Sequence, residues 1–201
     1  MCQLFETLKV EHRVLHNVES HNQRLNRARQ ERWGCTGYID LRTVIHLPED
    51  FPEGLHKCRV TYRQDIESIE FVPYTVRRIT RLKLVPADTI HYAYKFVNRA
   101  HLNQLKRMAR CGPTEEIIII KNGWITDTTY SNLAFFDGKR WFTPAFPLLR
   151  GTQRERLLQT GQIYEAQLRP RDLNRFITVK LINAMLDLET SPAISIHQIT
   201  R

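Results

Sequence analysis

The chain has 201 residues, of which 42% are hydrophobic and 25% are charged, an ordinary globular composition that suffices for one two-lobed domain or two small ones. No run of about 18 apolar residues occurs, so we expect no membrane-spanning segment. The net charge of +9 raises the hypothesis of a nucleic-acid partner. The basic residues are spread along the chain without an aromatic-interleaved motif, which argues against this hypothesis.

The first ninety residues alternate between β-rich and helical segments. Alternating apolar residues predict a strand over residues 4–10, and an Arg-rich helix is predicted over residues 21–33, with Ser20 as its N-cap and Gly34 at its end. The remaining predicted segments are a short strand beginning at Val14, a short helix over residues 41–47, a hairpin of strands over residues 57–64 and 66–74, and a strand over residues 79–85.

The second half opens with helical periodicity over residues 96–110 and then becomes β-rich. A continuous apolar run over residues 116–120 precedes Asn122-Gly123, which is typical of a buried strand followed by a tight turn. A helix is predicted over residues 152–159, directly after Gly151. The other predicted segments are strands over residues 131–136, 140–142, 162–168 and 194–196, a helical turn over residues 172–176, and an apolar strand or helix over residues 177–185.

This order of elements predicts an α+β chain in two lobes: a compact N-terminal α/β lobe over residues 1–90 and a β-rich C-terminal lobe over residues 91–201. Lys95 falls near the predicted division, and ligand sites favour such junctions. The four cysteines and eight histidines have no metal-ligand spacing, and the first residues do not look like a signal peptide. We therefore expect no metal and a cytoplasmic protein with reduced thiols.

Three sequence blocks in the second half resemble one family. They are Tyr94-Lys95-Phe96-Val97-Asn98-Arg99, the block from Asn122 to Leu133 that contains Thr126-Asp127 and Ser131-Asn132, and Phe142-Thr143-Pro144 followed by Leu149-Arg150-Gly151-Thr152-Gln153-Arg154. Their order, and the 32 residues from Lys95 to Asp127, are similar to those of the class IV aminotransferases (PLP fold type IV), which include branched-chain and D-amino-acid aminotransferases and aminodeoxychorismate lyase. A weaker fourth block, Phe5-Glu6-Thr7 with His21-Asn22-Gln23-Arg24-Leu25, resembles the same family.

The resemblance implies pyridoxal 5'-phosphate (PLP) as the cofactor and assigns a role to six residues. Lys95 would be the catalytic lysine that forms the Schiff base, and Asp127 would take the place of the family's Glu beside the pyridine nitrogen. The other implied cofactor-binding residues are Arg24, Asn132, Gly151 and Thr152. A helix start suits a phosphate, and an arginine fork suits its oxygens.

Each of these residues also has a structural interpretation. Lys95 could be a surface lysine, Arg24 part of a solvated helix face, Asp127 a turn residue after Asn122-Gly123, and Gly151 an ordinary helix start. Asp127 is one methylene shorter than the family's Glu, and the chain lacks the family's usual residues before Phe5-Glu6-Thr7. Both departures leave a catalytically inactive PLP-fold binding protein as an alternative.

Transamination of an amino-acid-like substrate through Lys95 is the expected reaction. The alternative is pyruvate elimination of the aminodeoxychorismate lyase type, which uses the same lysine on an amino-chorismate substrate. The resemblance further implies a homodimer. Tyr92, Tyr94, Arg77 and Arg78 precede Lys95 and are candidates for lining the substrate pocket.

Overall fold

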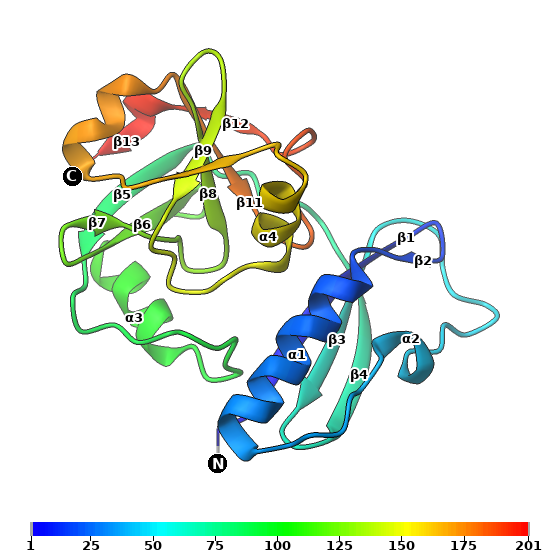
Figure 1. The fold of residues 1–201 in the computed structure, drawn as a ribbon. Helices are drawn as coiled ribbons and strands as arrows, with labels where there is room; N and C mark the ends of the chain where they lie inside the picture. Colours follow the sequence, from blue (N-terminus) through cyan, green and yellow to red (C-terminus); the bar gives the residue numbers. More distant parts are fainter. Residues whose placement is uncertain (1, 201) are drawn as a thin grey trace. The chain divides into compact units, whose positions relative to one another are not determined.

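The structure, a computed structural model, describes residues 2–200, which form two compact units (Figure 1). Within that range, the first unit comprises residues 2–76 and 94–98, and the second comprises residues 77–93 and 99–200. Lys95 therefore lies in a short segment of the first unit, which follows seventeen residues of the second unit in the chain.

The first unit is an antiparallel sheet with strand order β2-β1-β3-β4 and the long helix α1 (Figure 1). Alternate residues of β1, among them Leu4 and Leu8, are buried and pack with Leu25 and Ala28 of α1. The elements are β1 (Leu4–Glu11), β2 (Val14–Leu15), α1 (Val18–Trp33), α2 (Leu41–Val44), β3 (His56–Tyr62) and β4 (Ile66–Pro73). The predicted hairpin around Asp65 is confirmed as β3 and β4.

Helix α1 begins earlier than predicted. Its N-cap is Asn17, in the left-handed conformation with φ 55°, whereas Ser20 lies inside the first turn and donates its hydroxyl to Asn17 Oδ1 at 2.8 Å. The helix ends at Gly34 as predicted, where φ is 69° and the glycine N–H bonds to the carbonyls of the last turn. Asparagine adopts positive φ more readily than most residues, and Asn17 has this conformation in the tight turn between β2 and α1. The helix therefore begins directly after this turn.

Residues 94–98 form no helix, although helical periodicity predicted one from residue 96. Phe5 N–H donates to the Lys95 carbonyl at 3.0 Å, Val97 N–H donates to the Gln3 carbonyl at 2.9 Å, and Leu4 and Phe96 form an antiparallel bridge. Pairing with the start of β1 thus overrides local helix preference, and α3 (Ala100–Met108) begins only at residue 100.

The second unit contains two sheets. One has five strands in the order β10-β9-β8-β11-β12, and the other has four strands in the order β13-β5-β6-β7. Its strands are β5 (Arg81–Pro86), β6 (Glu115–Lys121), β7 (Trp124–Ile125), β8 (Asn132–Phe136), β9 (Trp141–Pro144), β10 (Tyr164–Ala166), β11 (Thr178–Ile182), β12 (Ala193–Ser195) and β13 (Ile199–Thr200). Its helices are α3, α4 (Thr152–Gln159) and the 3-10 turns η1 (Pro170–Arg175) and η2 (Ile196–Gln198).

Strand β6 explains the unbroken apolar run in the sequence. Ile118 and Ile120 pack into the main core of the second unit, whereas Ile117 and Ile119 pack with Leu102 of α3. Because both faces of β6 are covered, each position from 117 to 120 is apolar. The segment between β6 and β8 is hydrogen-bonded to this strand, whose residues 116–120 are buried.

The mixture of three sheets with a few helices confirms the predicted α+β class.

Candidate active site

Lys95 is partly buried, and its backbone is hydrogen-bonded to β1. Its carbonyl accepts from Phe5 N–H, and its ammonium lies 4.8 Å from the centroid of the Phe5 ring. An ammonium over an aromatic face is stabilised by the ring quadrupole. The side chain is thus anchored in the first unit rather than left as a solvated surface lysine.

Arg24 projects from α1 onto a buried carboxylate. Its Nε donates to Glu6 Oε1 at 2.9 Å, and its Nη2 donates to Glu6 Oε2. Only 10% of the Arg24 side chain is exposed, so the interpretation as a solvated helix face is wrong. Glu6 faces α1 from β1, because it has the same strand parity as Leu4 and Leu8.

His21 completes this cluster from the preceding turn of α1. Its Nδ1 lies 2.6 Å from Glu6 Oε2, and both side chains are fully buried. Burial would raise the pKa of Glu6, but the charge of Arg24 and the hydrogen bonds from His21 and Arg24 lower that pKa to about 2. Burial lowers the pKa of His21, so a neutral imidazole donates to an ionised Glu6.

Asp127 lies between β7 and β8 with only 5% of its surface exposed. Its Oδ1 accepts from Asn132 Nδ2 at 2.7 Å, and its Oδ2 accepts from Leu149 N–H at 2.9 Å. The Asp127 carbonyl accepts from Ile119 N–H of β6 at 2.8 Å. The side chain is therefore a buried acceptor, fixed by the loop before α4, and not a solvated turn residue.

Burial raises the pKa of Asp127 to about 6, although hydrogen bonds from Leu149 and Asn132 and the charge of Arg154 lower it. No cation forms a salt bridge with this carboxylate among the described residues. A carboxyl group in this environment exchanges its proton close to neutral pH.

Asn132, Gly151 and Thr152 surround the same loop. Gly151 is the N-cap of α4, and Thr152, the first residue of the helix, is buried. A Cβ atom on Gly151 would lie 2.0 Å from Asn132 Oδ1. In the second unit, the structure thus brings together Asp127, Asn132 and Gly151, while Lys95 and Arg24 belong to the first unit.

A second buried carboxylate supports the Asp127 segment. Glu116 Oε1 accepts from Thr129 Oγ1 at 3.0 Å, and its Oε2 accepts from Lys106 Nζ at 2.8 Å. Arg99 donates to the Thr129 carbonyl. These contacts anchor the chain two residues after Asp127 to both β6 and α3.

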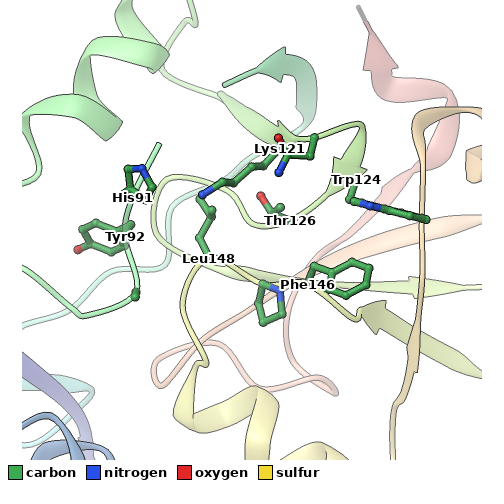
Figure 2. Close-up of a pocket in the computed structure, with 10 residues that line it drawn as sticks. His91, Tyr92, Lys121, Trp124, Thr126, Phe146 and Leu148 are labelled. Carbon is green, nitrogen blue, oxygen red and sulfur yellow. The ribbon is translucent and has the colours of Figure 1, made fainter. Parts of the chain in front are cut away.

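A pocket of about 350 Å³ lies in the second unit, where none of the six predicted site residues lines it. In Figure 2, His91 and Tyr92 lie on one side and Trp124 and Phe146 on the other. Thr126 and Leu148, the chain neighbours of Asp127 and Leu149, also line it. Of the residues considered for the substrate pocket, Tyr92 lies here, whereas Tyr94 donates to Glu31 at 2.9 Å and Arg77 stacks over Tyr130.

The sequence did not single out Glu6, His21 or Leu149 as site residues. Glu6 and His21 lie inside the Phe5-Glu6-Thr7 and His21 to Leu25 blocks that resemble the family, but the resemblance assigned a cofactor-binding role only to Arg24. Leu149 contributes its backbone, which leaves no mark in a side-chain pattern.

The chain belongs to the class IV aminotransferase family: the family described as "Amino-transferase class IV" matches residues 3–189. An uncharacterised protein of Haemophilus influenzae is 38% identical over 187 residues, which cover 92% of this chain and 98% of that protein. A Schizosaccharomyces pombe protein named as a candidate aminodeoxychorismate lyase is 31% identical over 108 residues, which cover 50% of this chain and 45% of that protein.

Solved structures share the fold. A candidate 4-amino-4-deoxychorismate lyase from Haemophilus somnus 129PT superposes with a TM-score of 0.83 and 33% identity, covering 94% of this chain and 98% of that chain. A hypothetical aminotransferase from Mycobacterium tuberculosis in its PLP-bound form has a TM-score of 0.75 and 18% identity, with 98% of this chain and 81% of that chain covered. The fold type IV assignment is confirmed.

The chemistry of the residues in each unit suits PLP, which is the cofactor predicted from the sequence and confirmed at the level of the family. The cofactor requires an amine, an acid for its ring nitrogen and donors for its phosphate. Lys95 offers the amine and Asp127 offers a buried acid. The start of α4, with Gly151 as its N-cap, offers backbone N–H donors for the phosphate.

Among residues 2–200, no group of three or more His, Cys, Asp or Glu side chains is arranged to hold a metal ion. No helix in the same range is long and apolar enough to cross a membrane.

Proposed function

We propose that the chain is a PLP-dependent enzyme that acts on an amino-acid-like substrate, with Lys95 as the catalytic residue. The observation that carries the proposal is Asp127: a buried acid, hydrogen-bonded to the loop that leads into α4, within the same motif order that contains Lys95. A buried acid with a pKa near neutrality and few charged partners is typical of a functional site.

PLP, when bound, supplies a ring that accepts the electron pair released at the substrate's α-carbon. Lys95 would hold the cofactor through Nζ and, once the substrate amine has replaced it, would move the α-proton as a general base and acid. Its contact with the Phe5 ring keeps the amine against a low-dielectric surface.

Asp127 would hold a proton or a negative charge beside the ring nitrogen. Because its pKa is about 6, it is largely ionised at neutral pH and can stabilise a protonated pyridine nitrogen. Arg24, Gly151 and Thr152 would hold the phosphate, through a guanidinium that Glu6 keeps oriented and through the start of α4. Asn132 is included in the proposed site.

Borohydride reduction tests the proposal most directly. Protein incubated with PLP and reduced should carry the phosphopyridoxyl group on the peptide that contains Lys95. Lys95→Ala should abolish labelling, and Lys139→Ala, at an exposed position, should retain it. Labelling of another lysine, or no uptake of PLP by the wild type, would overturn the proposal and favour the inactive binding protein.

Transamination is the predicted reaction, in which an amino acid and a 2-oxo acid exchange their amino and oxo groups. Pyruvate elimination is the second candidate, and a specific observation favours it: two relatives above 30% identity are named as candidate aminodeoxychorismate lyases. Pyruvate released from aminodeoxychorismate without an amino acceptor supports the lyase. Amino transfer from a panel of amino acids to 2-oxoglutarate supports the aminotransferase.

We further propose a cytoplasmic homodimer, as the resemblance to the family and the cysteine spacing predict. Sedimentation equilibrium of the PLP-loaded protein measures the oligomeric state, and a mass close to one 23.8-kDa chain contradicts the dimer.

A further inference from the structure

The amide nitrogen of Asn132 donates two hydrogen bonds within the second unit. The residue is 5% exposed at the start of β8, where it pairs with Ile182 of β11. Its Nδ2 donates to Asp127 Oδ1 at 2.7 Å and to the Leu149 carbonyl at 2.9 Å. Both partners accept hydrogen bonds and neither donates them, so the amide orientation is fixed, and both N–H groups are used.

The same pair of residues holds the Leu149 backbone from two sides. Leu149 N–H donates to Asp127 Oδ2, and the Leu149 carbonyl accepts from Asn132. Three hydrogen bonds therefore join one carboxylate, one amide and one loop residue. Since α4 starts three residues later, the carboxylate and the helix start are fixed relative to each other.

Gly151 has its place for a steric reason. Its φ of −73° and ψ of 140° are open to any residue, so backbone strain does not demand glycine. A Cβ atom there would lie 2.0 Å from Asn132 Oδ1 and 3.2 Å from Asn132 Cγ. The glycine is required because the Asn132 amide occupies the space that a side chain would need.

We propose that Asn132 is a positioning residue that ties the carboxylate of Asp127 to the backbone at the start of α4, with Gly151 as the space that its amide needs. The part of this inference that concerns PLP rests on the proposed function. In that role, Asn132 serves the ring end and the phosphate end of the cofactor together, and does so through Asp127 and Leu149 rather than by donating to the cofactor itself.

The steric half is tested by a thermal-unfolding cycle on the protein without PLP. Gly151→Ala should lower the Tm, and Asn132→Ala should lower it as well. The double variant G151A/N132A should melt at a higher temperature than the sum of the two single shifts predicts, because the clash disappears with the amide. Additive shifts would overturn the steric assignment.

The electrostatic half is tested by NMR of protein with 13C-labelled aspartate side chains, in which Asp127→Asn identifies the Asp127 signal. Asn132→Leu removes a donor that favours the ionised form, so the titration midpoint of Asp127 should move upward from its wild-type value. The matched control is Asn103→Leu at an exposed position of α3, which should leave the midpoint unchanged. An unchanged midpoint in N132L overturns the positioning role.

Cofactor binding links this inference to the proposed function. N132L should raise the Kd for PLP by roughly tenfold, the factor that matches the loss of one buried hydrogen bond. If the wild type takes up no PLP, the proposed function fails while the NMR and unfolding results still decide the role of Asn132. If the wild type binds PLP and N132L binds it equally well, the link to the cofactor is wrong.

Discussion

Glu6 in the first unit and Asp127 in the second are both buried carboxylates, yet their pKa values are shifted in opposite directions. Glu6 faces a guanidinium and an imidazole, and its pKa is lowered to about 2. Asp127 is approached by an amide and a backbone N–H, and its pKa is raised to about 6. Burial alone therefore does not set the ionisation of a carboxyl group; the charge of its hydrogen-bond donors decides it.

The difference matches what each carboxylate has to do. Glu6 stays ionised at every physiological pH and serves as a fixed anchor for Arg24. Asp127 can gain or lose a proton near neutrality, which is useful for a group that is proposed to act on a ring nitrogen.

The largest expected effect follows from removing the partner of Glu6. Arg24→Met leaves a fully buried carboxylate without its cation, and such a loss costs roughly 3–5 kcal/mol of unfolding free energy. Urea denaturation at pH 7 measures it. Arg27→Met, at an exposed position of the same helix, is the control and should stay within about 0.5 kcal/mol of the wild type. Equal effects for the two variants would show that Glu6 does not depend on Arg24.

Glu6→Gln should flatten the acid side of the stability curve. The pKa of Glu6 is lowered from 4.5 to about 2 on folding, so its contribution is present above pH 4.5 and is lost as the pH falls towards 2. This pH-dependent contribution of Glu6 to the unfolding free energy, which E6Q lacks, amounts to roughly 3 kcal/mol. Denaturation curves between pH 2 and pH 6 measure it, and a variant curve parallel to that of the wild type contradicts the lowered pKa.

Asp127→Asn should change the pH dependence in the opposite sense and by a somewhat smaller amount. The pKa of Asp127 is raised from 3.8 to about 6 on folding, so its contribution is present below pH 3.8 and is lost as the pH rises through 6. The wild type should therefore lose about 2 kcal/mol from this group between pH 4 and pH 7, and D127N should not. If E6Q and D127N change the slope of unfolding free energy against pH with the same sign, the contrast between Glu6 and Asp127 is wrong.

The smallest effect is expected for an ion pair at the surface of the first unit. Arg63, in the turn after β3, pairs with Glu67 of β4, and the two side chains are 43% and 30% exposed. Arg63→Met should change the unfolding free energy by less than about 1 kcal/mol, because solvent screens the pair. A loss as large as that of R24M would mean that burial does not distinguish the two arginine–glutamate pairs.

Local pattern was sufficient for much of the fold. The apolar run of β6, the hairpin of β3 and β4, and helix α4 after Gly151 follow from periodicity and from glycine and asparagine signals. The sequence blocks also gave the family and its cofactor, because their order is specific even though each block is short.

Other boundaries depended on contacts between distant segments. Residues 96–98 fall within the helical periodicity, yet they pair with the start of β1, because hydrogen bonds join Phe5 N–H to the Lys95 carbonyl and Val97 N–H to the Gln3 carbonyl. The N-cap of α1 lies at Asn17 because the turn from β2 requires a left-handed residue. Neither contact is visible in the neighbouring residues alone.

The amino-acid sequence by itself determined which residues are proposed for the chemistry: Lys95, Arg24, Asp127 and Gly151, the glycine before α4. Only the tertiary structure decided their states, because ionisation and steric room depend on which atoms come into contact. Arg24 is held by Glu6, Asp127 is raised towards neutrality by burial among neutral donors, and Gly151 is required by the amide of Asn132. The contacts of Arg24 with Glu6, of Gly151 with Asn132 and of Asp127 with Leu149 join residues 18, 19 and 22 positions apart in the chain, beyond the reach of a local pattern.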